Sequence, residues 1–321
     1  MKSKNIIFLC FYCSLILLWG CYKLPAEKTL PLNEAHQKLI KLCREEYKTG
    51  IIVKPFPNTV WIYLPVAEGF MQLKANDDGP KTSNEAKETR TINFLDGKFE
   101  NGVFKIQHDI TLAQTYAKDY GYGNTFTEKY QNQQRDILTA ISRVYNQVEP
   151  THSTAAAQKV PDFFILVGAD IVNGIETQTM FTFPDLKRVM TDAFFQDEYT
   201  KRNIMDYPKG DTKIIGDWKG THLKTYEMTW GEFLSKQMVH RIHSKYERSA
   251  FPPTGTDQEE ILKIVAEALT AYHFQGFQSV ELNDLHNKKI NRVAHAQMQK
   301  LIEDAASSKE KEGKLIEIHF R

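Results

Sequence analysis

The chain of 321 residues is 41% hydrophobic and 25% charged, a composition typical of an ordinary globular protein. Removal of residues 1–20, which hold two lysines and no acid, leaves 39 of the 41 basic residues against 40 acidic ones. A nucleic-acid partner usually requires a basic footprint, so this balance argues against one.

The first 21 residues have the features of an export signal. Lys2 and Lys4 precede an apolar run over residues 6–19, and the run closes on Gly20 and Cys21. A basic start, a short apolar stretch and a small residue at the cleavage point are typical of a secretory signal peptide. No later stretch has the run of about 18 or more apolar residues that indicates a membrane-spanning helix.

The end of this signal is more specific. Leu18, Gly20 and Cys21 resemble the lipobox of bacterial lipoproteins, in which the cysteine is acylated and becomes the mature N-terminus. The resemblance covers the signal alone. It implies a cleaved peptide at 1–20, a fatty acid such as palmitate on Cys21, and a protein anchored in the cell envelope, facing away from the cytoplasm. Tyr22 stands where enterobacterial lipoproteins carry the Asp of inner-membrane retention, which favours the outer membrane in a cell with two.

Two other interpretations of the leader stay open: an ordinary cleaved signal and an uncleaved anchor. The apolar stretch 6–20 has 15 residues, whereas a spanning helix needs about 20. Cysteine usage agrees with export, because Cys10 and Cys13 lie inside the signal and only Cys43 remains as a thiol after lipidation. Cys43 falls on the apolar stripe of a predicted helix, which favours a buried structural role.

The first half of the mature chain predicts hairpins between two helices. Residues 21–32 contain two prolines and suit a tether. The polar run 74–90 predicts a mobile surface loop, and Asn101-Gly102 predicts a hairpin turn. Residues 110–123 are ambiguous, because a tyrosine-rich loop can bind sugars or peptides but is more often packed. The predicted helices are 33–47 and 126–148, and the predicted strands are 51–54, 59–66, 70–73, 91–99 and 102–110.

The second half contains the most hydrophobic stretch of the mature protein, Phe163–Val167. Because it does not alternate, it predicts a central strand covered on both faces. Asn173-Gly174 then predicts an antiparallel partner over 175–183, and the capping boxes at 229–232 and 256–259 predict two helix starts. The predicted helices are 184–190, 194–202, 229–248, 256–272 and 290–306, and the predicted strands include 222–228, 277–282 and 315–320.

Helices and hairpins interleave here without the βαβ alternation of a parallel fold. We therefore expect an α+β fold in which antiparallel hairpins pack with several amphipathic helices. The polar connector 149–159 is the one candidate internal boundary, and it separates an N-terminal part, 33–148, from a C-terminal part, 160–321. These two parts could also form one domain. The sequence shows no internal repeat.

The best candidate for a metal site is a set of three side chains on one predicted helix. His240, His243 and Glu247 fall within about 60° of one another on a helical wheel. They share that arc with polar residues, so a solvent-exposed face without metal is the favoured interpretation. The zinc-protease motif His-Glu-x-x-His is absent, because Arg241 follows His240.

Three aspartates lie at the ends of the two predicted central strands. Asp162 and Asp170 bracket the first, and Asp185 follows the second. Carboxylates in such positions can hold a metal or act as acid and base, but they are also common turn and cap residues.

No nucleophile elbow, dinucleotide fingerprint or phosphate-binding loop occurs in the sequence. The favoured hypothesis is a lipid-anchored envelope protein that serves as a binding or structural module, without enzymatic activity or cofactor. Its expected partners are the membrane, through the lipid on Cys21, and an envelope protein or polymer. The alternative is a membrane-tethered hydrolase of envelope polymers, for which a metal-dependent mechanism stays open.

Overall fold

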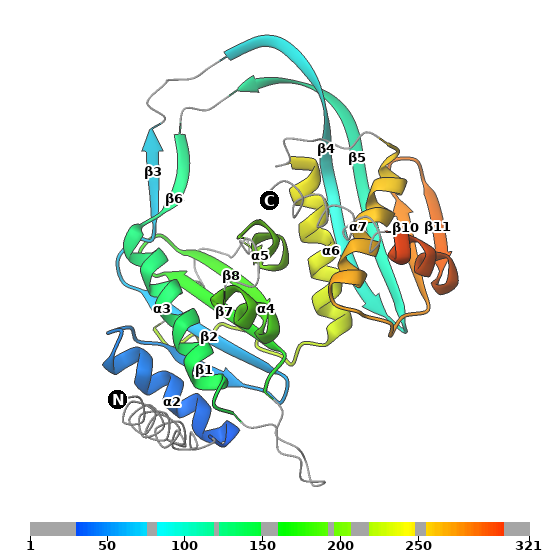
Figure 1. Cartoon of the computed structure of the whole chain (residues 1–321). Coiled ribbons are helices and arrows are strands. Elements are labelled where there is room, and N and C mark those ends of the chain that lie inside the picture. Colours follow the sequence, from blue (N-terminus) through cyan, green and yellow to red (C-terminus); the bar gives the residue numbers. More distant parts are fainter. Residues whose placement is uncertain are drawn as a thin grey trace, which may run out of the picture.

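The computed structural model describes residues 30–75, 82–118, 122–148, 160–191, 196–206, 218–247 and 255–304. Two mixed β-sheets and the helices that cover them form the body (Figure 1), which confirms the predicted α+β class. Within the described residues, no helix combines the length and the apolar character needed to cross a membrane.

The first sheet has five strands in the order β1-β2-β7-β8-β9. β2 and β7 run parallel, whereas the other neighbours are antiparallel. Every residue of β7 is buried, which confirms the central strand predicted from its apolar run. The strands are β1 (Ile52–Pro55), β2 (Thr59–Val66), β7 (Phe163–Asp170), β8 (Ile175–Thr182) and β9 (Ile204–Asp206).

One face of this sheet is covered by α2 (Leu32–Glu45), α3 (Glu128–Tyr145) and α4 (Phe183–Met190) (Figure 1). Because side chains alternate along a strand, Phe164 joins the core under these helices while Phe163 joins the core on the opposite face. Cys43 of α2 is fully buried in the first of these cores, and this burial raises the pKa of its thiol to about 12.

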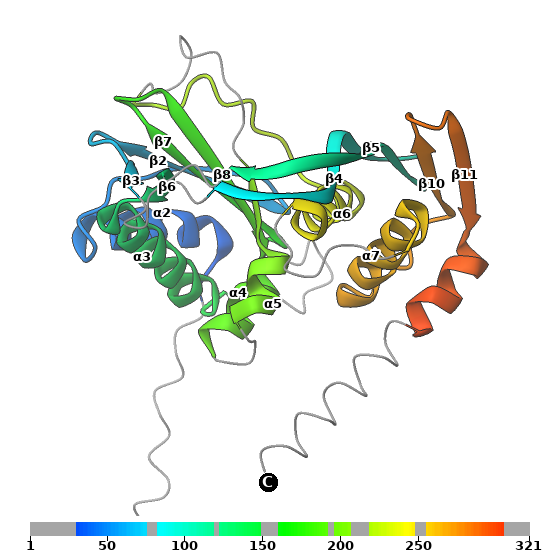
Figure 2. The same cartoon turned by 90° about the horizontal axis from the view of Figure 1, so that it is seen from above.

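The opposite face is crossed by residues 218–229, the yellow-green segment above the strands in Figure 2. Trp61 Nε1 donates to the carbonyl of Tyr226 (2.8 Å), and Lys54 Nζ donates to the carbonyl of Gly220 (2.8 Å). The strand predicted over 222–228 is therefore wrong. The backbone of this segment bonds to side chains of the sheet and joins no ladder.

The second sheet has four strands in the order β11-β10-β5-β4, and β5 and β10 run parallel. Helices α6 (Trp230–Glu247) and α7 (Asp257–Ala271) pack against one of its faces (Figure 2). Phe233 of α6 also packs on Phe163 of β7 (5.2 Å between ring centroids), so the two sheets share one core. The strands are β4 (Thr82–Glu100), β5 (Val103–Lys118), β10 (Ser279–Asp284) and β11 (Lys289–Ala294).

The two sheets follow the same plan. In each, an antiparallel hairpin lies beside a parallel strand that opens a second hairpin: β1-β2 beside β7-β8, and β4-β5 beside β10-β11. In the first sheet, α3 precedes the parallel strand β7, and α4 follows the second hairpin. In the second sheet, α7 precedes the parallel strand β10, and a helix over residues 295–304 follows the second hairpin. The chain thus contains two interlocked units of like topology, although its sequence shows no repeat. Both units combine strands from residues 33–148 with strands from 160–321.

The remaining elements are short. β3 (Met71–Ala75) and β6 (Tyr122–Phe126) form a two-stranded sheet of their own, and α5 (Gln196–Arg202) precedes β9. The capping boxes are confirmed at α6 and α7. The hairpin turn at Asn101 and Gly102 is confirmed as well, since both residues have positive φ, 50° and 75°.

Two further predicted elements are wrong. The described residues of the polar run 74–90 are strand, in β3 up to Ala75 and in β4 from Thr82 on. β4 pairs with β5, and this backbone ladder needs no apolar side chains. This pairing also makes strand of the ambiguous stretch as far as Lys118. The helix predicted from 290 begins only at 295. Residues up to Ala294 belong instead to β11, which pairs with β10. The backbone N of Asn287 donates to Asp284 Oδ1 (2.9 Å) in the turn between these two strands. The predicted strand 315–320 lies outside the described residues.

Candidate functional site

The three strand-end aspartates serve the fold separately. Asp162 accepts from Trp230 Nε1 (3.0 Å), Asp185 accepts from Arg202 Nη1 (3.1 Å), and Asp170 accepts from the backbone N of Phe70 (2.8 Å). Asp162 and Asp170 lie at opposite ends of β7, about 26 Å apart for an eight-residue strand. These contacts tie helices and loops to the first sheet, and the aspartates of β7 form no acid–base pair.

The predicted metal candidates lie on α6, but this helix is more buried than the helical wheel indicated. Every residue from 230 to 246 is at least half-buried, His240 and His243 included, because α6 lies between the two sheets. Glu247 is the last residue of α6, and its side chain lies outside the described part. Among the described residues, no three His, Cys, Asp or Glu side chains are grouped so that they could hold a metal ion. Cys21 also lies outside the described residues.

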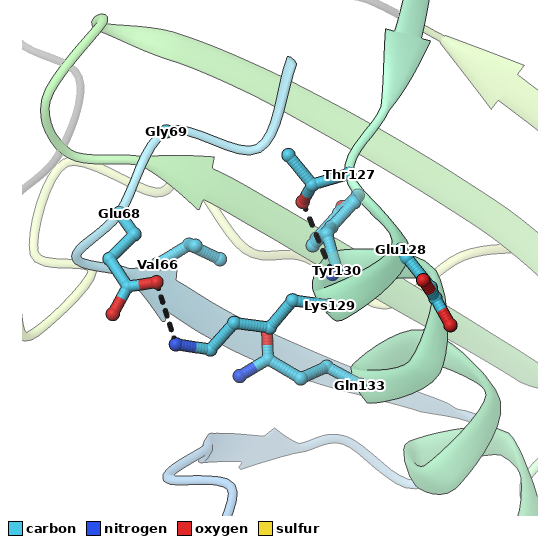
Figure 3. A pocket seen from close by; sticks show the side chains of 8 residues that line it. All are labelled: Val66, Glu68, Gly69, Thr127, Glu128, Lys129, Tyr130 and Gln133. Carbon is cyan, nitrogen blue, oxygen red and sulfur yellow. Dashed lines mark hydrogen bonds and ion pairs between the residues drawn. The ribbon is translucent and has the colours of Figure 1, made fainter. Parts of the chain in front are cut away.

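The candidate site that the structure offers lies around the first turns of α3. A cavity of about 390 Å³ is formed by Val66, Glu68 and Gly69, which follow or end β2, together with residues 127–130 and Gln133 (Figure 3). A second cavity of about 500 Å³ adds residues 47–49, Asn132 and Asp136 and shares Glu128, Lys129 and Gln133 with the first. We call these two adjoining cavities the α3 groove.

The position of the α3 groove follows from the topology. β2 and β7 are the parallel pair of the first sheet, and the groove opens where β2 ends, beside the N-terminus of the helix that crosses over to β7. In open sheets with parallel strands, ligands commonly bind outside the carboxyl ends of those strands. Thr127 caps the helix here, since its Oγ1 accepts from the backbone N of Tyr130 (3.3 Å).

The floor of the groove is rigid. The ring of Tyr130 stacks on Phe70 at 4.4 Å, and its hydroxyl forms a hydrogen bond with Thr177 Oγ1 (2.7 Å). The hydroxyl lies so close over Gly168 that a Cβ there would come within 1.9 Å of it. The glycine inside the most apolar strand is thereby explained, because only the absence of a side chain admits Tyr130.

The walls of the groove are polar and carry both charges. Lys129 Nζ and Glu68 Oε2 form an ion pair at the rim (2.7 Å), drawn as a dashed line in Figure 3. Inside, Gln133 Oε1 is buried and has no hydrogen-bond partner among the described residues. A buried acceptor without a partner costs about 1–3 kcal/mol. Gln133 lines both cavities, so a ligand donor would recover this cost once the amide turns toward the groove.

No motif in the sequence marks the α3 groove, because its residues come from three separate segments that meet only in the fold. Thr127 ahead of an amphipathic helix is the one local signal, and it indicates a helix start without indicating a site. The ion pair between Glu68 and Lys129 joins residues 61 positions apart, a separation at which the sequence alone carries no spacing rule.

A second polar cluster lies at the corresponding end of the second unit. His108 of β5 is 2% exposed and its Nδ1 has no hydrogen-bond partner in the described part of the chain. Nearby, Asp257 Oδ1 accepts from Arg90 Nη1 and from the hydroxyl of Tyr246, both at 3.0 Å. Burial lowers the pKa of His108, and the carboxylates of Asp284 and Asp257 oppose this shift.

The lowered pKa of His108 predicts that the protein loses stability in acid. In the unfolded chain, His108 takes up a proton near the ordinary histidine pKa of about 6.5, whereas in the folded chain its lowered pKa keeps it neutral to lower pH. Protonation therefore favours the unfolded chain, so the free energy of unfolding is highest above that pH and decreases as the pH falls below it. We expect the melting temperature to drop between pH about 7.5 and 5.5, and to drop less in His108→Gln. His273→Gln removes an exposed histidine and should keep the wild-type slope. An unaltered slope in His108→Gln would contradict the prediction.

Comparison of the chain with models of protein families, with curated proteins and with solved structures finds no match. The function is therefore inferred from the residues of the chain itself.

Proposed function

We propose that the chain is a lipid-anchored cell-envelope protein whose folded part is a binding module, with the α3 groove as its binding site. The observation that carries this proposal is the pair of adjoining cavities at the end of the parallel pair β2 and β7. Each cavity falls within the range of about 300–1,000 Å³ that is usual for ligand sites. The converging polar groups around Gln133 supply hydrogen bonds that could orient a ligand.

The anchor and the groove would lie at opposite ends of α3. The described chain begins at Leu30, whose backbone N donates to the carbonyl of Gln147 (2.9 Å) just beyond the C-terminus of α3. An 18-residue helix is about 27 Å long, and the groove lies at its N-terminal end. Cys21 and Leu30 are nine positions apart along the chain, which is a reach of at most about 30 Å. This geometry would hold the groove away from the anchored end, toward material in the envelope.

The hydrolase remains the alternative, and the groove gives it less support. A general acid needs a carboxyl group kept protonated by apolar surroundings. Glu68 is instead 73% exposed and paired with Lys129. The groove residues therefore suit binding better than proton transfer.

The proposal is tested by sedimentation of the full chain, purified in detergent, with isolated cell envelopes from which the lipid has been extracted, so that the lipid on Cys21 cannot itself attach the chain. Lys129→Glu places a second carboxylate against Glu68 and should weaken binding by about tenfold or more, which is about 1.4 kcal/mol. Lys41→Glu is the matched control, because Lys41 is also an exposed helix lysine facing a glutamate, Glu45 at 4.0 Å, but lies outside the groove. Equal binding by all three proteins, or by none, would reject the groove as the binding site.

A further inference from the structure

This inference rests on the proposed function and concerns its ligand. We propose that the α3 groove binds an uncharged chain rich in hydroxyl groups, that is, a saccharide strand, which lies along the first turns of α3 across both cavities. The supporting observations are the mixed charge of the groove, its paired donors and acceptors, its one fixed aromatic wall and its length.

The charges of the groove do not suit a strongly charged polymer. Its lining carries three carboxylates, Glu68, Glu128 and Asp136, and two ammonium groups, Lys48 and Lys129, interspersed along the same surface. A polyanion is held where basic groups stand unopposed, and a polycation where acids do. Here Lys129 is already neutralised by Glu68 at 2.7 Å, so either polymer would meet repulsion beside each attraction.

Hydroxyl groups match this mixed lining. A hydroxyl donates one hydrogen bond and accepts others, so it fits where acceptors and donors alternate. Gln133 contributes a buried Oε1 that has no partner among the described residues, and Asn132 adds an amide beside it. Carboxylates such as that of Glu128 accept further hydroxyl donors. Gln133 lines both cavities, so a turn of its amide toward the groove would let a sugar hydroxyl donate to Oε1, which has no partner among the described residues.

The second cavity adds an aromatic wall. Tyr47 lines it half-buried, and Arg143 Nη1 donates to its hydroxyl (3.1 Å), which fixes the ring. A fixed aromatic ring offers an apolar face at low entropic cost, against which the C–H face of a sugar ring can stack. The polar walls and this one ring together present the two kinds of surface that a saccharide has.

The length of the groove indicates a chain and not a single sugar. The lining on α3 and its cap extends from Thr127 to Asp136, which are nine positions apart and therefore about 13 Å apart along the helix axis. That distance exceeds one sugar ring, so the two cavities would hold successive units of the same strand.

The test measures binding of defined probes to the full chain in detergent by calorimetry. The probes are a neutral oligosaccharide (tetra-N-acetylchitotetraose or a dextran oligomer), inorganic polyphosphate and an oligolysine peptide. We expect a neutral oligosaccharide to bind with an affinity that changes little between about 0.05 and 0.5 M salt, because no net charge is matched. Gln133→Leu should weaken this binding about tenfold without lowering the melting temperature, because it removes a buried acceptor that has no partner among the described residues. Gln131→Leu alters an exposed glutamine of α3 outside the groove and should bind as the wild type does.

Each other result counts against the inference. Binding of polyphosphate or oligolysine alone, with steep salt dependence, would replace the saccharide by a charged ligand. Equal affinity of Gln133→Leu and wild type would remove the groove from saccharide binding. If the chain binds envelopes and loses this binding in Lys129→Glu, but neither oligosaccharide competes with the envelopes, then the ligand is not a saccharide and the proposed binding function stands. If the envelopes do not bind at all, the proposed function fails with it.

Discussion

Phe164→Asp is expected to leave the protein unfolded at room temperature. Phe164 is fully buried near the start of β7, the middle strand of the first sheet, and packs edge-on against Tyr145 (4.9 Å between centroids) and in a stack against Phe181 (5.8 Å, 12°). A carboxylate in that position would have no counter-ion, and removing it from water costs several kcal/mol, out of the roughly 5–15 kcal/mol that stabilises a folded protein.

Circular dichroism during heating measures this effect. Phe94→Asp makes the same chemical change at a phenylalanine of β4 that is 44% exposed, and it should melt within a few degrees of the wild type. A cooperative, wild-type transition in Phe164→Asp would mean that this side of β7 faces solvent. Such a result would also undermine the α3 groove, because α3 packs on the same core through Tyr145 and Ile141.

The sequence predicted those elements that depend on local chemistry. The hairpin turn at Asn101-Gly102 needs only two residues that tolerate positive φ. The starts of α6 and α7 need only a threonine and a glutamate three residues apart. The buried strand at Phe163–Val167 can be recognised because its apolar residues are consecutive and do not alternate with polar ones. Such signals act within a few positions, so one sequence is enough to recognise them.

What the sequence did not predict depends on partners far away in the chain. The parallel pair β2 and β7 joins residues about a hundred positions apart, such as Val60 and Phe164, and no local pattern distinguishes a parallel neighbour from an antiparallel one. Polar residues near Arg90 form a strand because β5 supplies the ladder. The floor of the α3 groove has the same origin, since Tyr130 and Gly168 fit together only once α3 lies on the first sheet.

Cys21→Ser is expected to abolish fatty-acid incorporation and to leave an uncleaved precursor. If the leader acts as the lipobox that it resembles, the sulfur of Cys21 is the acceptor of the lipid, and serine cannot replace it. The anchoring energy would disappear with the lipid, since each buried methylene contributes about 0.8 kcal/mol to membrane attachment. Labelling of cells with radioactive palmitate measures the incorporation. Partition of the extracted protein between detergent and water measures the loss of the anchor.

Cys43→Ser is the matched control, because it removes the other cysteine that a mature chain would keep. The thiol of Cys43 is fully buried on α2, and its pKa, raised to about 12 by burial and by the nearby Asp136, keeps it protonated and unreactive at neutral pH. Labelling should therefore be unchanged in Cys43→Ser and absent in Cys21→Ser. Full labelling of Cys21→Ser would end the lipoprotein proposal, and the geometry that points the α3 groove away from an anchored end would lose its basis with it.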